Sequence, residues 1–282
     1  MVCKLRKWRR CLVDLTKHCL CASYIYMVSA EAVCLAPLTK TFRFFLPNLS
    51  DLYLGRLNMD EHNLCHLLES LRFIPNLMIL SVQGKPLSRA HCCTADVNTA
   101  ADFTHKTLRR LKLSGIILTP AVAAFLGRLL PEMSSLETLE LTGANGNTVQ
   151  AEEMEALFGG FNKTLPLCVL TFRGFSVRGC LAPLAKSLHF FPNLNALDLD
   201  KLNMDESELR GLLESLRCIP NLKILHLSGN PLGHAVTSIV QLPKLEYLFM
   251  ERTGSEEDLN FVEKTIEQAK RGIIVLTPLY YW

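Results

Sequence analysis

The chain contains 282 residues, 49% of them hydrophobic, and its 30 lysines and arginines against 27 acidic residues give a formal charge of +3. Because this balance is close to neutral, neither nucleic acid nor an anionic membrane is expected as the main partner. No stretch reaches the roughly 20 apolar residues that a membrane-spanning helix needs. The 11 cysteines are odd in number and mostly follow helix or strand patterns, which favours free thiols in a reducing, cytoplasmic protein.

Residues 1–34 form a divergent N-terminal segment. Basic residues from Lys4 to Arg10 precede an apolar stretch, as in a signal peptide, but Asp14 and Lys17 interrupt it, so we expect no export signal. The first 20 residues fit no repeat pattern. Tyr24 and Tyr26 then stand where a strand would place its buried leucines, which predicts a degenerate capping repeat.

A short leucine motif recurs through residues 35–282. Its clearest copy is PNLKILHLSGNPL at 220–232, which follows the template LxxLxLxxNxL of a leucine-rich repeat. The template begins at Leu49, Leu77, Leu108, Leu136, Leu167, Leu194, Leu222 and Leu245, in steps of 28, 31, 28, 31, 27, 28 and 23 residues. Steps of this length leave room for a full helix after each strand. They predict an α/β leucine-rich repeat solenoid, a horseshoe of the long, ribonuclease-inhibitor-like class, with parallel strands on the concave face and helices on the convex face.

The helices predicted between these strands can be taken in chain order. Apolar residues at helical spacing, with capping residues or a first-turn proline, predict helices at 35–45, 60–74, 119–130, 150–161, 181–191, 205–219 and 256–270. Residues 88–107 are polar and are interpreted as containing a loop. Residues 272–276 predict a closing strand. The whole domain is therefore expected to hold about eight repeats and a C-terminal cap.

The ninth template position departs from the leucine-rich consensus. Asn230 occupies it in the clearest copy, but the other copies carry Leu57, Lys85, Ile116, Ala144, Phe175, Leu202 and Thr253. A continuous ladder of asparagines is therefore absent, and backbone groups in these loops must find other partners. Replacing Asn230 with alanine is expected to destabilise the protein only locally, within the ~0.5 to 3 kcal/mol usual for a point substitution.

A longer repetition lies above the single motif. Residues 35–90 and 181–235 share over half of their residues, including the runs LAPL, LNMDE, LLESLR and IPNL. The shared residues include surface positions such as Asn58 with Asn203. We interpret this as a recent duplication of a block of five repeats, which explains the likeness without any shared function.

Three patterns that carry chemistry in other proteins have simpler interpretations here. The run from Gly159 to Thr164 ends like a phosphate-binding loop but lacks its first glycine, and is interpreted as a helix C-terminus. His91 with Cys92 and Cys93, and His18 with nearby cysteines, lack the second spaced pair of a zinc site. A cysteine nucleophile would need a base that the sequence does not identify. We therefore expect no enzyme activity, no cofactor and no metal.

The outward face of the predicted strands is the sharper candidate. Side chains at template positions two, three, five, seven and eight point away from the leucines, because side chains alternate along a strand. Mixed charges with aromatic residues suit a protein or peptide partner better than a polyanion, although any solvated sheet carries mixed charges. The candidate partner-binding residues are Tyr53, Arg56, Arg109, Arg110, Lys112, Arg173, Asp198, Lys201, His226, Tyr247, Phe249 and Arg252.

The repeats resemble those of the NLR family of innate immune receptors, in particular its NAIP-type members. The likeness covers about residues 35–282 and extends through helices and loops in LNMDEHNLCHLLESLRFIPNL, LSGIILTPAVAAFLGRLLPEMSSLETLELTG and QAEEMEALFGGFNKTLP. In that family zinc-binding BIR domains and an ATP-binding NACHT domain precede the repeats, and none of their motifs is present here. The family detects bacterial proteins, assembles inflammasomes and is linked to inhibition of apoptosis.

The resemblance implies a sensing or autoinhibitory module. Its partner would be the nucleotide-binding domain of an NLR receptor or a bacterial protein ligand, because the repeats of such receptors fold back over the nucleotide domain. Two alternatives remain open. The first alternative is a free-standing leucine-rich inhibitor of a cytosolic enzyme, which would need a strongly charged or aromatic concave face. The second is a truncated copy without an independent function.

Overall fold

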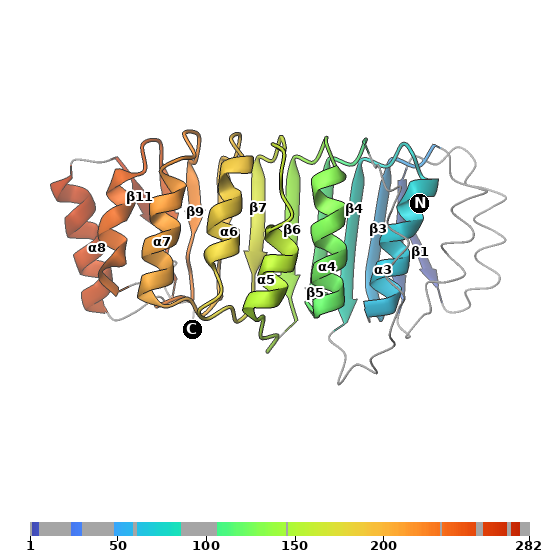
Figure 1. Cartoon of the computed structure of the whole chain (residues 1–282), viewed down its shortest axis with the longest axis horizontal. Helices are drawn as coiled ribbons and strands as arrows, with labels where there is room; N and C mark the ends of the chain where they lie inside the picture. Colours follow the sequence, from blue (N-terminus) through green and yellow to red (C-terminus); the bar gives the residue numbers. More distant parts are fainter. Residues whose placement is uncertain are drawn as a thin grey trace. The chain divides into compact units, whose positions relative to one another are not determined.

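The computed structural model describes residues 2–5, 24–29, 48–58, 61–85, 106–144, 146–231, 233–251, 256–269 and 272–276. The chain forms two compact units, Met1–Ala144 and Asn145–Trp282. Within each unit parallel strands pair in the order in which they occur in the sequence, and helices lie on one side of the sheet (Figure 1). The protein is therefore an α/β protein with a repeat-like, all-parallel arrangement of strands.

The first unit contains six described strands. They are β1 Val2–Leu5, β2 Tyr24–Ser29, β3 Asp51–Asn58, β4 Ile79–Lys85, β5 Arg110–Ile116 and β6 Thr138–Gly143. Helix α3 Glu61–Ser70 continues into the 3-10 helix η1 Leu71–Phe73, and α4 Pro120–Leu129 continues into η3 Leu130–Glu132. Each of these helices follows a strand and leads back to the next, as a parallel connection requires.

The second unit repeats this design with shorter strands. Its strands are β7 Val169–Arg173, β8 Ala196–Asp198, β9 Ile224–His226, β10 Tyr247–Phe249 and β11 Ile274–Leu276. Its helices are α5 Ala151–Phe158, α6 Ala182–Ser187, α7 Glu206–Leu216 and α8 Glu256–Gln268, with 3-10 helices η4 Leu188–Phe190 and η5 Gly233–Gln241. The α-helix after β9 is replaced by η5, where the step between template leucines shortens to 23 residues.

Equivalent template positions pair with each other across the strands. In the first unit Leu52, Leu80, Leu111 and Leu139, all at position four, are consecutive register partners. In the second unit Leu170, Leu197, Leu225 and Leu248 pair in the same way. All eight side chains are buried. The leucine spacing therefore defines both the strands and the face that each strand buries.

Side-chain caps fix where several helices begin. Thr119 accepts a hydrogen bond from the Val122 amide at 3.3 Å, ahead of Pro120 in the first turn. Asp205 accepts one from the Glu208 amide at 2.9 Å, and the Glu208 carboxylate accepts one from the Asp205 amide at 3.0 Å. These side-chain oxygens accept hydrogen bonds from amides that have no partner within the first turn of a helix. The helices predicted at 60–74, 119–130, 150–161, 181–191, 205–219 and 256–270, and the closing strand, are confirmed.

Glu208 also joins two successive repeats. Its second carboxylate oxygen accepts hydrogen bonds from the Cys180 amide at 2.9 Å and the Leu181 amide at 3.1 Å, ahead of helix α6. One carboxylate therefore caps the start of its own helix and the start of the preceding one.

The prediction for Tyr24 and Tyr26 is wrong by one residue. Ile25 pairs with Leu52 and is buried, whereas Tyr24 and Tyr26 are 40% and 36% exposed. Because side chains alternate along a strand, this shift moves both tyrosines from the core to the outward face. The N-terminal segment also differs from expectation, since Val2–Leu5 forms β1 and pairs with β2. The helix predicted at 35–45 and most of the loop at 88–107 lie outside the described residues.

In five repeats the residue at the eighth template position has a left-handed backbone conformation. Gly115, Gly174 and Gly229 occupy it with φ angles of 70°, 74° and 72°. Arg56 and Lys201 occupy it with φ angles of 58° and 56°, a left-handed conformation that costs a residue with a side chain roughly 1 to 2 kcal/mol. The candidate residue Arg56 lies inside β3, where the pairing with β4 shifts between Leu54 and Leu57, and Lys201 lies in a turn after β8.

Candidate functional site

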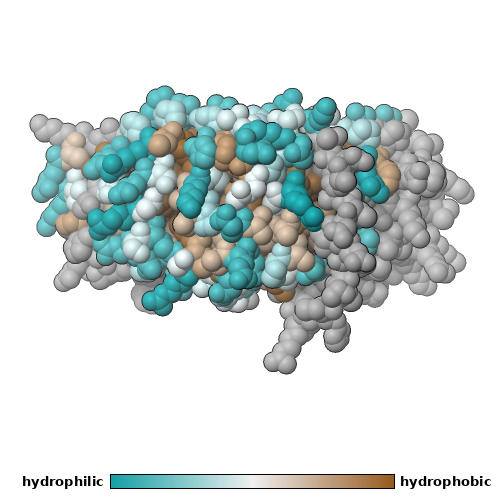
Figure 2. All heavy atoms as spheres, in the orientation of Figure 1, coloured by the Kyte–Doolittle hydropathy of each residue, from teal (hydrophilic) through white to brown (hydrophobic). Residues whose placement is uncertain are grey.

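Exposed large hydrophobic residues gather on the outward face of the strands, which is the side away from the buried template leucines. Six of the seven in the described residues lie there or at a strand start: Tyr24, Tyr26, Met78, Tyr247, Ile274 and Leu276. The seventh, Phe261, belongs to helix α8. Figure 2 shows the opposite side, where the helices lie in front of the strands, and there hydrophilic residues surround small areas of hydrophobic ones.

Two of the four charged candidates of the first unit, Arg109 and Lys112, form ion pairs with a neighbouring strand. Arg109 and Glu137 form an ion pair at 3.2 Å, and Lys112 and Glu140 form one at 2.6 Å. Each pair joins identical template positions in adjacent repeats. Such exposed pairs contribute at most ~1 kcal/mol each. Arg109 and Lys112 therefore neutralise acids of the same sheet. Arg56 and Arg110 are exposed, and the described residues offer neither of them an ion-pair partner.

Charges are also paired between adjacent strands in the second unit. Arg173 contacts Asp198 at 3.4 Å, and Lys223 contacts Glu246 at 2.8 Å. His226 stacks on Phe249 with ring centroids 3.9 Å apart and planes 3° apart. Tyr247 is exposed beside Ile274, its register partner on β11. The structure thus brings His226, Tyr247 and Phe249 together at one end of this unit, while Arg252 lies outside the described residues.

Three tyrosines form a cluster on the first unit. The Tyr24 and Tyr53 rings lie 5.4 Å apart and the Tyr26 and Tyr53 rings 6.2 Å apart, each pair tilted. Tyr53 was a candidate from the sequence, whereas Tyr24 and Tyr26 were assigned to the core. The alternation of Ile25 and Met27 with these tyrosines is the sequence signal that places them correctly.

Asp198 and Asp200 form a small acidic centre at the end of β8. Asp200 accepts a hydrogen bond from the Ser228 amide at 2.8 Å, and Asp198 accepts one from the Asp200 amide at 3.1 Å. Burial, and then the charge of Asp198, raise the pKa of Asp200, although the Ser228 amide, His226 and Arg173 act in the opposite direction. The ionised Asp200 carboxylate is thus held at a net cost in the folded protein.

We predict that Asp200→Asn stabilises the protein at neutral pH by a few tenths of a kcal/mol, and by less than ~1 because the group is part exposed. A carboxyl whose pKa is raised on folding contributes most to stability below its unfolded pKa, and that contribution is lost as pH rises through the folded pKa. Asparagine keeps an acceptor for the Ser228 amide and does not ionise. Urea denaturation at pH 7 and near pH 4 should therefore show the advantage of the variant shrinking as pH falls. An advantage that grows at low pH would contradict this account.

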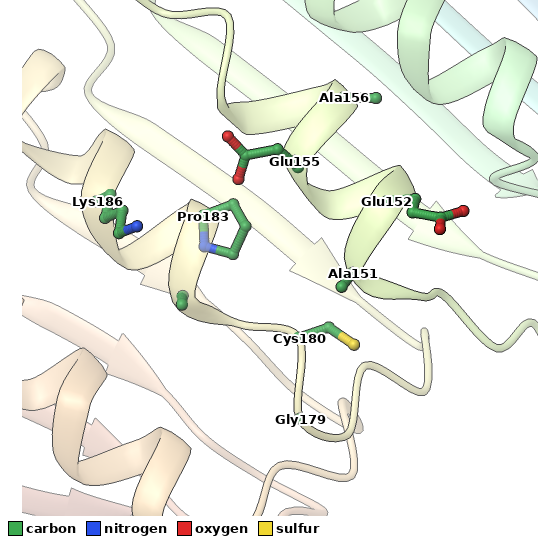
Figure 3. A pocket seen from close by; sticks show the side chains of 9 residues that line it. Ala151, Glu152, Glu155, Ala156, Gly179, Cys180, Pro183 and Lys186 are labelled. Carbon is green, nitrogen blue, oxygen red and sulfur yellow. The ribbon is translucent and has the colours of Figure 1, made fainter.

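A groove of about 650 Å³ lies between α5 and α6 of the second unit (Figure 3). Its floor is lined by small or apolar residues that include Cys180 and Pro183, and Glu155 and Lys186 lie on its two sides. Glu155 directs its carboxylate toward Pro183, whereas Glu152 points away. Burial, then Glu208 and Glu153, raise the pKa of Cys180, so this thiol stays protonated at neutral pH. The groove therefore lacks an activated nucleophile among the residues that line it.

We predict that the buried Cys65 reacts with iodoacetamide at pH 8 on the order of a thousandfold more slowly than the exposed Cys218. Burial, then the charges of Glu61 and Glu69, raise the pKa of Cys65 to about 12, and only the thiolate is alkylated. Mass spectrometry of timed samples measures both rates, and the difference should vanish in urea. Equal rates in the folded protein would show that the α3 side of the core opens freely.

A second groove of about 570 Å³ runs along the strand starts of the first unit. Polar residues line most of it, with Met78, Lys106 and Arg109, and Thr107 donates its hydroxyl to the carbonyl of Pro75 at 2.6 Å. All of its lining residues lie within two positions of the first template leucine of a repeat. The groove therefore belongs to the same repeated surface as the strand face.

The other chemical candidates gain no support from the geometry. The run from Gly159 lies at the C-terminus of α5, as interpreted from the sequence, and not at a helix start that would cradle phosphate. The described residues contain no group of three His, Cys, Asp or Glu side chains arranged to hold a metal ion. Cys92, Cys93 and the cysteines near His18 lie outside them. None of the described helices has the length and apolar character needed to cross a bilayer.

Comparison of the chain with protein-family models found no match, and comparison with curated proteins found none either. The site is therefore characterised by its own geometry, which is an outward strand face with paired charges and two exposed aromatic clusters on a repeat-like α/β fold.

Proposed function

We propose that the chain is a leucine-rich repeat solenoid of the long, ribonuclease-inhibitor-like class that acts as a non-enzymatic protein-interaction module. Three features support the repeat class: the LxxLxLxxNxL spacing, the in-register pairing of equivalent leucines, and a helix after nearly every strand. Solenoids of stacked repeats present a continuous strand face to their partners, and stability is shared between neighbouring repeats.

The observation that carries the binding role is the concentration of exposed tyrosine, isoleucine, leucine and methionine on the strand face. Protein interfaces are enriched in aromatic residues and methionine, and exposed apolar side chains that gather on one face mark interaction sites. The paired charges beside them form a neutral polar rim. This composition suits a protein partner rather than a polyanion.

The partner proposed is a protein of an innate immune complex in the cytoplasm. The runs at 57–77, 113–143 and 150–166 resemble the C-terminal leucine-rich region of NAIP, the neuronal apoptosis inhibitory protein of the NLR family. We therefore propose a sensor or autoinhibitory role, with the nucleotide-binding domain of an NLR receptor or a bacterial protein as the ligand. A free-standing inhibitor of a basic enzyme would need a strongly acidic strand face, and the paired charges do not provide one.

A binding assay with purified components tests this proposal. The full chain is immobilised and offered either an NLR nucleotide-binding domain or a small basic ribonuclease. We expect the receptor domain to bind, and Tyr247→Ala to weaken it about tenfold or more, the loss typical of an aromatic anchor. Phe261→Ala is the matched control, because both side chains are 38% exposed but Phe261 lies on α8. Binding of the ribonuclease alone, or equal losses from both variants, would reject the proposal.

A further inference from the structure

The duplicated blocks allow two copies of the same strand face to be compared within one chain. Residues 47–85 align with residues 192–230 without a gap. Only two of the ten outward strand positions are identical in both copies, whereas 22 of the other 29 positions are. Core, loop and most helix positions have thus been retained while the outward face has changed. The two faces therefore differ in what they can bind, although their scaffolds are alike.

The central outward position shows the difference most clearly. Tyr53 in the first copy corresponds to Asp198 in the second. Asp198 is neutralised by Arg173 on the preceding strand, at 3.4 Å. Tyr53 instead contacts Tyr24 and Tyr26 on the preceding strand, at ring distances of 5.4 and 6.2 Å. In the second copy the charge of Asp198 is thus neutralised within the chain, whereas in the first copy the half-buried Tyr53 contacts two exposed tyrosines.

Asp51 breaks the charge pattern of the strand face. Glu137, Glu140, Asp198 and Glu246 are each paired with a basic side chain on an adjacent strand. The register partners of Asp51 are Tyr24 and Ile79, and neither is basic. Its carboxylate accepts a hydrogen bond from the Ser50 hydroxyl, and the described residues provide no cation for it. Asp51 is thus an outward acid next to the tyrosine cluster for which the described residues offer no cation, and a basic side chain of a partner can supply one.

We propose that Tyr24, Tyr26, Tyr53 and Asp51 bind an arginine or lysine side chain of a protein partner. The tyrosine faces attract a cation through their ring quadrupoles, and Asp51 forms with it an ion pair like those that Glu137, Glu140, Asp198 and Glu246 form within the chain. This inference rests on the proposed function, since it names the chemistry that the partner brings to the strand face. It assigns the cation-binding role to the first unit alone, because Asp198 replaces Tyr53 in the second.

Fluorine NMR on the full chain labelled with 3-fluorotyrosine tests the site directly. The six tyrosines give separate signals that single Tyr→Phe variants assign. The probes are a short glycine–serine peptide with one central arginine and the same peptide with citrulline, which keeps the shape and loses the charge. We expect the arginine peptide to shift the Tyr24, Tyr26 and Tyr53 signals and to bind about tenfold more tightly than the citrulline peptide. The Tyr247 signal should not move.

Two variants separate the contributions of ring and carboxylate. Asp51→Asn should lower the affinity for the arginine peptide by about threefold to tenfold, and Tyr53→Ala should lower it at least as much, while Phe261→Ala on α8 leaves it unchanged. Equal shifts with arginine and citrulline, or full affinity in Asp51→Asn, would overturn the inference. If the NLR domain still binds through Tyr247 in that case, the proposed function stands and only the cation site is lost.

Discussion

Replacing Asn230 with alanine is expected to lower the free energy of unfolding by ~3 kcal/mol. The side chain is 1% exposed, and its oxygen accepts a hydrogen bond from the Leu202 amide at 2.9 Å. Its nitrogen donates to the carbonyls of Leu199 at 2.8 Å and Leu227 at 3.0 Å. Alanine leaves these backbone groups buried without partners, and each such group costs ~1 to 3 kcal/mol unless water reaches it. Urea denaturation measures the loss.

Asn221→Ala is the matched control for this prediction. Asn221 is a half-buried residue in the same repeat, and its side chain accepts an exposed hydrogen bond from Lys244 at 2.9 Å, so its loss should stay within ~0.5 kcal/mol. Hydrogen exchange then tests whether the Asn230 effect is local. Protection should fall at 199–204 and 227–231 and persist in α7. Comparable losses in both variants, or a uniform fall across the second unit, would contradict the local role.

The leucine spacing predicts the strands and helices because it combines a two-residue spacing within each strand with a longer step between strands. Positions four and six of the template are two residues apart, which puts both on one face of a strand, and the longer step leaves a helical stretch between strands. Because the template leucines are buried throughout the sheet, they determine which side of each strand faces the core. The structure bears this out in the in-register pairing of Leu52 with Leu80 and of Leu197 with Leu225.

The leucine spacing does not predict the buried residues of β2, where the pattern is weakest. Tyr24–Ser29 has no leucine to anchor the register, and the choice between Tyr24 and Ile25 as the buried residue depends on neighbouring strands. Pairing of Ile25 with Leu52 decides it, and a one-residue shift reverses the exposure of every side chain. A sequence shows that side chains alternate along a strand, but pairing with the neighbouring strand determines which set faces the core.

Charge pairing on the strand face could have been derived from the template. Arg109 and Glu137 both occupy position two, and Lys112 and Glu140 both occupy position five, so each pair meets across neighbouring strands. Arg173 and Asp198 occupy different positions and meet diagonally, which only the structure reveals. Considered singly, these residues were plausible partner-binding cations. Compared between adjacent repeats, most of them neutralise each other.

Gly115→Ala is expected to destabilise the protein by ~3 kcal/mol. Gly115 has a φ of 70°, and a left-handed conformation costs alanine roughly 1 to 2 kcal/mol. A Cβ added there would also stand 2.9 Å from the carbonyl oxygen of Gly84, a backbone atom on the adjacent strand. Moving that strand disturbs the pairing of β4 with β5, and overpacking of this kind costs ~1 to 3 kcal/mol. Urea denaturation of the full chain measures the combined effect.

Two other glycines separate the causes of this loss. Gly146 has a φ of 77° with nothing within 4 Å of an added Cβ, so Gly146→Ala should show only the ~1 to 2 kcal/mol conformational cost. Gly211 lies within α7 in open space, and Gly211→Ala should raise stability by up to ~1 kcal/mol, because alanine favours a helix over glycine. The expected order of stability is Gly211→Ala, parent, Gly146→Ala, Gly115→Ala. If Gly115→Ala is no less stable than Gly146→Ala, the Gly84 carbonyl imposes no packing restraint, and the left-handed backbone at Gly115 accounts for the loss alone.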